Sequence, residues 1–229
     1  MIRPKIILIT DPAYDEATIL DVIEKVGSAL PHGSLAVQLR DKTRPFFAMR
    51  DWAMRLRALT ARKRVGLILN GDAANAAELG AEGVHLGSGT AASIERARAE
   101  YGDSLWISVA VHSDDDVRRA CRQGAHAVLV SPVFAVPEKG KARGVRAIET
   151  AAGIAQGAVD VYALGGVTAE DAAVCAAAGA QGVAAIRALL SSREPVQAAL
   201  SMYDAIEAYA SGSCRSLPVN RRFLTNTCD

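Results

Sequence analysis

The stretch LILNGDAANAAELGAEGVHLG, residues 67–87, holds two short apolar runs joined by an alanine-rich segment with helical spacing. Both runs are apolar on either face, as strands enclosed in a parallel sheet must be. An Asn-Gly pair ends the first run, and His-Leu-Gly ends the second. The stretch therefore predicts a strand, a helix and a second, parallel strand.

The same unit recurs along the chain. A Gly-Ala pair separates a helical segment from the next apolar run in ELGAEGVHL (78–86), RQGAHAVLV (122–130) and AAGAQGVAA (177–185). Gly80, Gly124 and Gly179 are expected to end these helices, because glycine adopts the left-handed conformation without steric cost. Eight runs are strand candidates: 5–10, 34–39, 65–69, 83–86, 105–111, 127–131, 161–164 and 182–186.

About eight strand-helix units predict a single (β/α)₈ TIM barrel over residues 1–210. The alternative is an open, doubly wound α/β sheet. A dinucleotide-binding sheet would carry GxGxxG after its first strand, and neither that motif nor GxxxxGK[ST] is present. The barrel is favoured, and residues 211–229 are expected to form a polar, weakly docked tail.

Composition narrows the class of partner. The 229 residues are 50% hydrophobic and 22% charged, with a formal net charge of +1. The balance of charge gives no electrostatic case for binding nucleic acid or a membrane surface. The first apolar run is too short for a signal peptide or a membrane span, so a cytoplasmic protein is expected. Four scattered cysteines lack the spacing of a zinc site.

In a parallel barrel, the residues that follow the strands converge on one mouth. Polar or glycine residues stand at nearly all of these positions, which indicates a functional site. They are Thr10, Asp11, Gln38, Arg40, Lys42, Asn70, His85, His112, Ser131, Gly165, Gly166 and Arg187.

Three segments at the mouth are candidates for holding an anion. GGVTAED, residues 165–171, is expected to open a helix whose N-terminus, with Gly165, Gly166 and Arg187, binds phosphate. A tight turn capped by Thr168 is the structural alternative. Arg40 and Lys42 suit a phosphate or pyrophosphate, unless they form only a solvated loop. The loop 134–144 carries Lys139, Lys141 and Arg143 and resembles a lid that closes over an anion.

Two histidines follow neighbouring strands, and they are expected to differ. His112 lies between a strand and a helix that Ser113 is expected to cap, so its imidazole can exchange protons at the mouth. A loop-bonded histidine is the structural alternative. His85 precedes Leu86-Gly87, and a satisfied, half-buried role is the better expectation.

Taken in order, these motifs resemble the thiamine phosphate synthase/TenI family. The match comprises LITD, VQLRDK, residues 70–87, SVAVHS, SPVF followed by Lys139, and LGGVTAEDA, over nearly the whole chain before the tail. The resemblance implies a (β/α)₈ barrel and a homodimer that acts on thiazole phosphate. It implies His112 and Lys139 as catalytic residues and Gln38, Arg40, Lys42, Asn70 and Ser131 as substrate-binding residues.

The family contains two activities, and the chain carries signs of both. Synthases join thiazole phosphate to hydroxymethylpyrimidine pyrophosphate and usually hold magnesium through two aspartates. Those places hold Gly71 and Thr90 here, and Asp72 would need a changed loop register to serve. Asn70-Gly71 instead resembles the tautomerases, which aromatise thiazole phosphate carboxylate by acid/base catalysis. Gln38, Arg40, Lys42, Asn70 and Lys139 match synthase positions.

We therefore expect thiazole tautomerisation, with no metal or other cofactor and with thiazole phosphate as the ligand. Thiamine phosphate synthesis is the alternative, with Mg²⁺ and a pyrimidine pyrophosphate as second substrate. A catalytically silent relative that binds thiazole or thiamine phosphate is a third interpretation. An unrelated phosphate-binding barrel isomerase is a weaker fourth.

Overall fold

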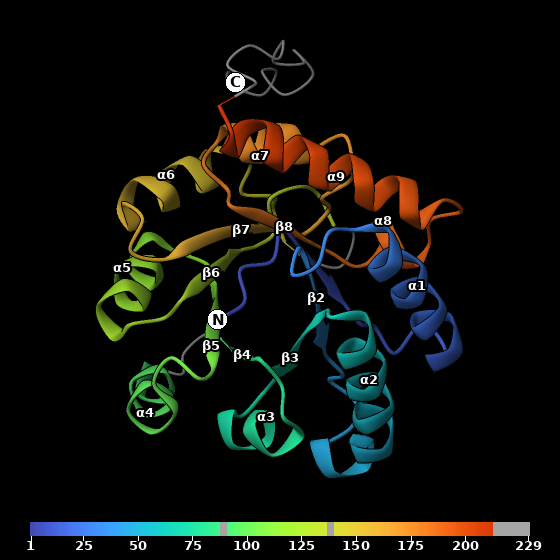
Figure 1. Ribbon diagram of the computed structural model, residues 1–229. Helices are drawn as coiled ribbons and strands as arrows, with labels where there is room; N and C mark the ends of the chain where they lie inside the picture. The colour runs from blue at the N-terminus through green and yellow to red at the C-terminus, as the bar shows by residue number, and fades with distance from the viewer. Residues whose placement is uncertain (88–90, 137–139, 213–229) are drawn as a thin grey trace.

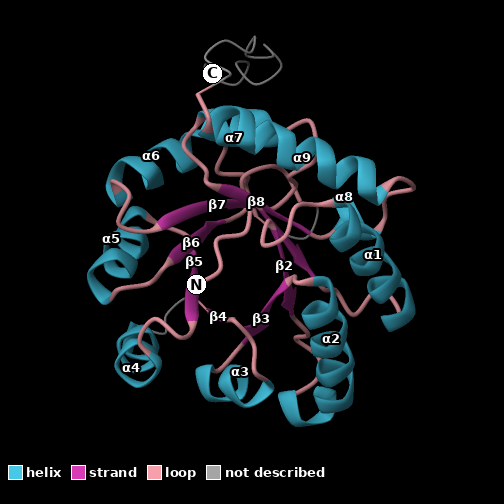
Figure 2. Ribbon diagram, viewed as in Figure 1, coloured by secondary structure: helices cyan, strands magenta, loops and turns pink. Residues whose placement is uncertain are grey.

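A computed structural model of the protein describes residues 1–87, 91–136 and 140–212. Eight parallel strands close into a barrel in sequence order, and β8 pairs with β1 (Figures 1 and 2). The predicted fold class is confirmed. The strands are β1 (Ile6–Ile9), β2 (Leu35–Leu39), β3 (Gly66–Asn70), β4 (Gly83–Leu86), β5 (Trp106–Val111), β6 (Ala127–Val130), β7 (Asp160–Leu164) and β8 (Gly182–Ala185).

The helices form a ring outside the strands (Figure 2). They are α1 (Glu16–Ala29), η1 (Phe46–Met49), α2 (Arg50–Lys63), α3 (Ala73–Leu79), α4 (Ala91–Tyr101), α5 (Asp114–Gln123), α6 (Arg146–Ala155), α7 (Ala172–Ala177), α8 (Arg187–Leu190) and α9 (Pro195–Ala210). Gly80 and Gly124 end α3 and α5 with φ of 70° and 77°, as predicted. None of the helices in the described residues is long and apolar enough to cross a membrane.

Two hydrophobic clusters divide the core. The larger lies between strands and helices and takes the outward-facing strand residues, such as Leu8 and Val37. The smaller lies inside the barrel and includes Ile7, Trp106 and Tyr162. Since side chains alternate along a strand, every second residue points into the barrel. Inward residues later in each strand lie closer to the mouth.

The N-terminal segment is fixed at the end of the barrel opposite the mouth. Its end lies inside the ring of helices in Figure 1. The Tyr162 hydroxyl donates a hydrogen bond of 2.7 Å to the Pro4 carbonyl, and the Tyr162 ring meets Trp106 edge to face at 6.0 Å. This end of the barrel is therefore packed shut, and the candidate site lies at the other end.

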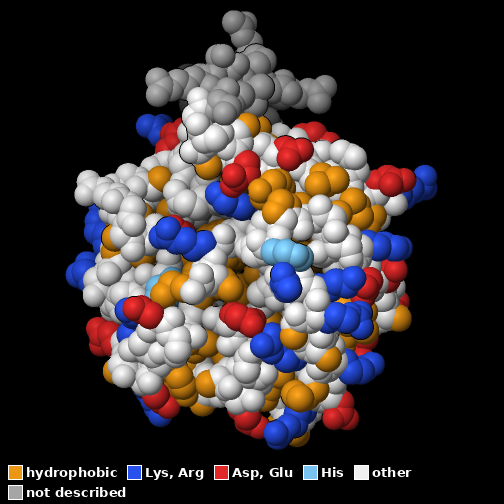
Figure 3. Space-filling view, viewed as in Figure 1, with side chains coloured by type: hydrophobic (Ala, Val, Ile, Leu, Met, Phe, Trp, Pro, Cys, Tyr) orange, Lys and Arg blue, Asp and Glu red, His pale blue; other side chains and the backbone are white. Residues whose placement is uncertain are grey.

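Charges of both signs are interspersed on the face shown in Figure 3, in keeping with the small net charge.

From residue 213 onward, the predicted tail lies outside the described residues. The boundary at residue 210 coincides with the end of α9, but the division into a domain and a tail remains a prediction.

Candidate functional site

A layer of polar side chains lies inside the barrel below the mouth. Gln38, His85 and Ser108 are buried, and all three occupy inward positions on β2, β4 and β5. His85 Nδ1 lies 2.9 Å from Ser108 Oγ. Burial, with a smaller contribution from the charge of Arg40, lowers the pKa of His85 to about 4, so the imidazole is neutral at pH 7. The expectation of a hydrogen-bonded histidine is confirmed, but the ring is buried rather than half-buried.

Gln38 is different, because its buried amide is incompletely satisfied. The side chain is 1% exposed, and its Nε2 has no hydrogen-bond partner among the described residues. An unpaired buried donor costs about 1–3 kcal/mol, so such a group is consistent with a ligand that accepts from it. This agrees with the predicted substrate-binding role of Gln38, which remains a prediction.

His112 is held at the mouth with one ring nitrogen in use. It follows the last residue of β5, and its exposed imidazole places Nδ1 3.2 Å from the Ser131 carbonyl oxygen. A carbonyl oxygen only accepts, so Nδ1 carries the proton and donates it in this bond. In the neutral imidazole, Nε2 is then the free acceptor, which is the form that a general base needs.

The start of α5 fixes the backbone beneath this imidazole. Asp116 Oδ2 accepts hydrogen bonds from the backbone N–H groups of His112 and Ser113, at 2.9 and 3.0 Å. Ser113 Oγ accepts in return from Asp116 N, which completes the capping box. Burial opposes the shift, but these donors lower the pKa of Asp116, so its carboxylate stays charged.

The glycine pair after β7 is closely packed against the segment after β6. Gly165 and Gly166 have φ of 95° and 69°, and a Cβ on Gly165 would lie 2.8 Å from Pro132 Cα. A Cβ on Gly166 would lie 2.9 Å from the Ala135 carbonyl oxygen. The requirement for glycine is thus explained by backbone conformation and protein packing. The expected approach of a ligand to these Cα atoms is not needed to explain it.

The predicted helix start after this pair is wrong. The helix α7 begins at Ala172, and Asp171 Oδ2 accepts from both the backbone N–H and the hydroxyl of Thr168. Thr168 is therefore not the N-cap. Five residues of turn separate Gly166 from α7, and none of the hydrogen bonds among the described residues uses the backbone N–H of Gly166 or Val167. These two amides are available to an anion.

Three arginines around the mouth lack a carboxylate partner in the described part of the chain: Arg40, Arg143 and Arg187. Arg44 and Arg119, by contrast, pair with Asp41 and Asp116. Unpaired guanidinium groups on segments that follow strands at one mouth favour an anionic ligand. Lys42 is exposed nearby, whereas Lys139 lies outside the described residues.

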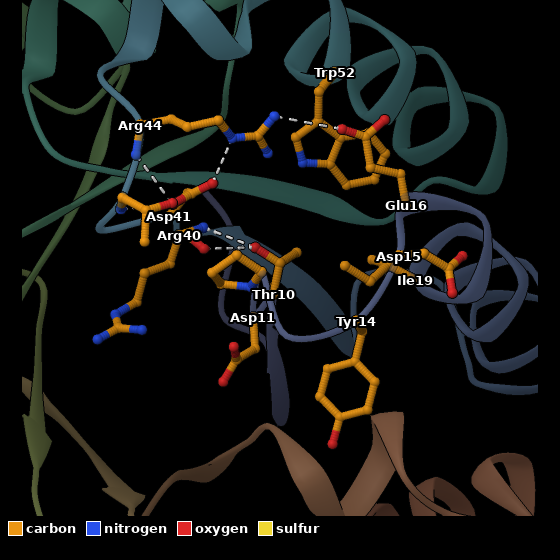
Figure 4. A pocket seen from close by; sticks show the side chains of 12 residues that line it. Thr10, Asp11, Tyr14, Asp15, Glu16, Ile19, Arg40, Asp41, Arg44 and Trp52 are labelled. Atoms are coloured by element: carbon orange, nitrogen blue, oxygen red, sulfur yellow. Dashed lines mark hydrogen bonds and ion pairs between the residues drawn. The ribbon is translucent and has the colours of Figure 1, made fainter.

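A side pocket opens between the first two strand-helix loops (Figure 4). It has a volume of about 320 Å³, with Ile19 and Trp52 buried in its wall and Arg40 beside it. Hydrogen bonds from Thr43 and Arg44 lower the pKa of Asp41 to about 2, although burial works in the opposite direction. Because Asp41 is turned toward Thr43 and Arg44, the guanidinium of Arg40 is left unpaired.

The donors near β3 do not fit a magnesium site. Asn70 ends β3 and Gly71 follows it. Asp72 Oδ1 accepts from the backbone N–H groups of Ala74 and Asn75 at 2.8 and 3.3 Å, so this carboxylate caps α3. Thr90, at the place of a second aspartate, lies outside the described residues. Among those that the structure describes, no three His, Cys, Asp or Glu side chains group as metal ligands.

Sequence similarity identifies the family. Residues 6–189 match the TMP-TENI family, described as thiamine monophosphate synthase. The chain belongs to this family. A thiamine-phosphate synthase of Azoarcus sp. (strain BH72) is similar to it, with 36% identity over 205 residues that cover 88% of this chain and 96% of that protein.

One further sequence relative and one solved structure are similar to the chain. A thiamine-phosphate synthase of Gloeobacter violaceus is 34% identical over 176 residues, which cover 76% of this chain but 51% of that protein. The chain thus matches about half the length of that relative. The thiamine phosphate pyrophosphorylase of Pyrococcus furiosus superposes with a TM-score of 0.72 at 24% identity, over 90% of this chain and 96% of that one. At this identity, the likeness supports the fold alone.

Two contacts in the site, the partner of His85 and the anchor of the His112 ring, were not predicted from the sequence. The alternation Trp106, Ser108, Ala110 marks residues that point into the barrel, and it is the signal that identifies Ser108 as a partner for His85. The anchoring of the His112 ring by the Ser131 carbonyl has no sequence signal, because it joins the ends of two strands through a main-chain atom.

Proposed function

We propose that this member of the thiamine monophosphate synthase family is a thiazole tautomerase, which aromatises thiazole phosphate carboxylate by proton transfer. The observation that carries the proposal is the hydrogen bond from His112 Nδ1 to the Ser131 carbonyl, which leaves Nε2 as an acceptor at the mouth. Aromatisation of the ring needs one group that removes a proton from a ring carbon and a proton returned to the side chain.

The reaction moves one proton from the ring to the side chain. The C–H bond at the ring carbon next to the carboxylate breaks, and Nε2 of His112 takes the proton. The electron pair enters the ring, which becomes aromatic as the exocyclic double bond is lost. A proton then adds to the exocyclic carbon of the phosphate-bearing side chain. Protonated His112 is one donor for it, so the residue can act as base and then as acid.

Binding of the substrate is assigned to the cationic side of the mouth. The free amides of Gly166 and Val167, together with Arg187, are suited to the phosphate. In this proposal, Gln38 on β2 and Asn70 on β3 face the thiazole ring from across the barrel. Lys139, Lys42 and Ser131 keep the roles that the family resemblance implies. A cytoplasmic location and a homodimer likewise remain predictions.

Thiamine phosphate synthesis is the second candidate, and the names of the relatives favour it. That reaction expels pyrophosphate, whose developing charge must be stabilised. The donors around Asn70 do not fit magnesium, because Gly71 has no side chain and Asp72 caps α3. Arg40, unpaired beside the side pocket, is the strongest argument for a synthase with a rebuilt pyrophosphate site.

The two reactions can be compared directly in one protein preparation. One assay follows aromatisation of thiazole phosphate carboxylate. The other follows thiamine phosphate formed from thiazole phosphate and hydroxymethylpyrimidine pyrophosphate, with Mg²⁺. We expect the second reaction to be at least about 10²-fold slower than in an ordinary synthase, which is the typical cost of one lost electrostatic element. Thiamine phosphate formation at an ordinary rate, without aromatisation, would overturn the proposal. Binding without either turnover would favour the silent relative.

A further inference from the structure

Arg143 is anchored on the same two strand ends as His112. Its Nη1 donates a hydrogen bond of 3.2 Å to the carbonyl oxygen of Val111, the residue directly before His112. Its backbone N–H donates a bond of 2.9 Å to Pro132, the residue directly after Ser131, which accepts from the His112 ring. The guanidinium of Arg143 and the imidazole of His112 are therefore both held by the backbone at the ends of β5 and β6.

The backbone around Arg143 is also held in place. The next residue, Gly144, donates 2.9 Å to the Val133 carbonyl, and Val133 donates 2.9 Å to Leu164 on β7. The segment after β6 is thus bonded on one side to β7 and on the other to residues 143 and 144. The far end of the loop that was expected to act as a lid is fixed, so Arg143 holds a defined position at the mouth.

The guanidinium retains donors for a ligand. Arg143 is partly exposed and forms no ion pair with any carboxylate of the described chain. One of its five N–H donors is used by Val111. A planar guanidinium is matched in geometry to a carboxylate, which it can bind through two parallel hydrogen bonds.

We propose that Arg143 is the specificity residue that binds the substrate carboxylate beside Nε2 of His112. This inference rests on the proposed tautomerase function and extends it. Removing a proton from the carbon next to a carboxylate delocalises negative charge onto the carboxylate oxygens. A guanidinium held on them strengthens its interaction as that charge develops, and it orients the C–H bond toward the imidazole.

The proposal separates two anion sites by ligand. The corner with Arg187 and the Gly166 and Val167 amides takes the phosphate, which thiazole phosphate and its carboxylated form both carry. Arg143 takes the carboxylate, which is present on the tautomerase substrate and its product and absent from thiazole phosphate itself. Removal of the positive charge at Arg143 should therefore alter the preference between the carboxylated ligand and thiazole phosphate.

The test is calorimetric binding of two ligands to the full chain. One is the aromatic product of the proposed reaction, which carries the carboxylate, and the other is thiazole phosphate, which lacks it. Arg143→Gln should weaken the carboxylated ligand about 10- to 100-fold, as expected when a charged hydrogen-bond partner is lost, and leave thiazole phosphate within twofold. Arg146→Gln is the matched control, because Arg146 is an exposed arginine three residues away at the start of α6. It should change neither affinity.

Equal weakening of both ligands, or no change in either, would overturn the assignment. If Arg143→Gln fails to fold, the wild-type protein is measured with the ligand whose carboxylate is replaced by a carboxamide. An affinity at least tenfold lower for the carboxamide supports the proposal, and Arg143→Lys, which keeps the positive charge, should retain part of this preference. Equal affinity for acid and amide contradicts it.

Binding also separates this inference from the proposed function. If the protein prefers the carboxylated ligand through Arg143 but does not aromatise the substrate, the carboxylate site stands and the tautomerase proposal fails. If aromatisation depends on His112 but is unchanged in Arg143→Gln, the tautomerase proposal stands and the role of Arg143 fails.

Discussion

The ends of β4 and β5 place two histidines in different surroundings, one buried and one exposed. His85 lies within β4, is 6% exposed and has a partner in Ser108. His112 lies one residue beyond β5 and is exposed, and among the described residues its ring bonds through Nδ1. A position inside or just outside a strand end therefore decides whether an imidazole packs a barrel or serves its mouth. The comparison can be tested residue by residue.

The largest expected effect is on catalysis at the end of β5. His112→Gln should lower the rate of thiazole phosphate carboxylate aromatisation about 10²- to 10⁴-fold, the usual contribution of a general acid-base group. Thermal stability should hardly change, because the ring is exposed. Steady-state kinetics and a melting curve on the same sample check both statements. A variant with wild-type turnover would remove His112 from the mechanism.

The second effect is the pH dependence of stability at β4. Burial lowers the pKa of His85 to about 4, against about 6.5 in the unfolded chain, so the unfolded state binds the extra proton between these values. Stability from this group is therefore present above pH 6.5 and falls as the pH drops toward 4. From pH 7 to pH 5, the loss is about 2 kcal/mol in the free energy of unfolding.

Urea unfolding at pH 7 and pH 5 measures this loss, with His85→Gln as the reference for all other titrating groups. The wild-type protein should lose about 2 kcal/mol more than the variant over this interval. Equal losses in the two proteins would mean that His85 is not buried in the neutral form.

A smaller effect concerns the partner of His85. Ser108→Ala leaves a buried ring nitrogen without its hydrogen bond, and we expect a loss of about 1–2 kcal/mol in the free energy of unfolding. Turnover at saturating substrate should stay within a few-fold of wild type, because Ser108 does not bond to His112. A loss of turnover as large as that in His112→Gln would place the two histidines in one site and remove the contrast.

The smallest effect is expected from the cap below His112. Ser113→Ala removes the side chain that accepts from Asp116 N, and an N-cap of this kind contributes about 1 kcal/mol. The backbone N–H of His112 keeps its bond to Asp116, so the imidazole should stay in place. Chemical denaturation and kinetics at one pH test this separation. Unchanged stability would show that Asp116 alone holds the start of α5.

The fold could be predicted because its signal is local and repeated. Each strand is a short apolar run, and glycines at positions such as 80 and 124 end helices through a backbone preference that the residue itself carries. The polar residues at strand ends followed from the same geometry, since parallel strands finish at one edge.

Other features could not be predicted, either because the local sequence fits two roles or because they depend on contacts between distant segments. Asp72 caps α3, which the local sequence permits but does not distinguish from a rebuilt metal ligand. The tight packing of Gly165 against Pro132 explains a glycine that the sequence suggested was there for a ligand. The bonds from His112 and Arg143 to main-chain carbonyls join β5, β6 and the following loop, and no side-chain pattern encodes them.

The closure of β1 against β8 has a consequence for synthesis of the protein. The first strand gains its second neighbour only when residues 182–185 have been made, and there the backbone N–H of Val183 donates to the Lys5 carbonyl oxygen. On the ribosome, one edge of the nascent sheet therefore stays open until four-fifths of the chain has emerged. An open edge of this kind can pair with other chains, so the growing polypeptide is exposed to aggregation during that interval.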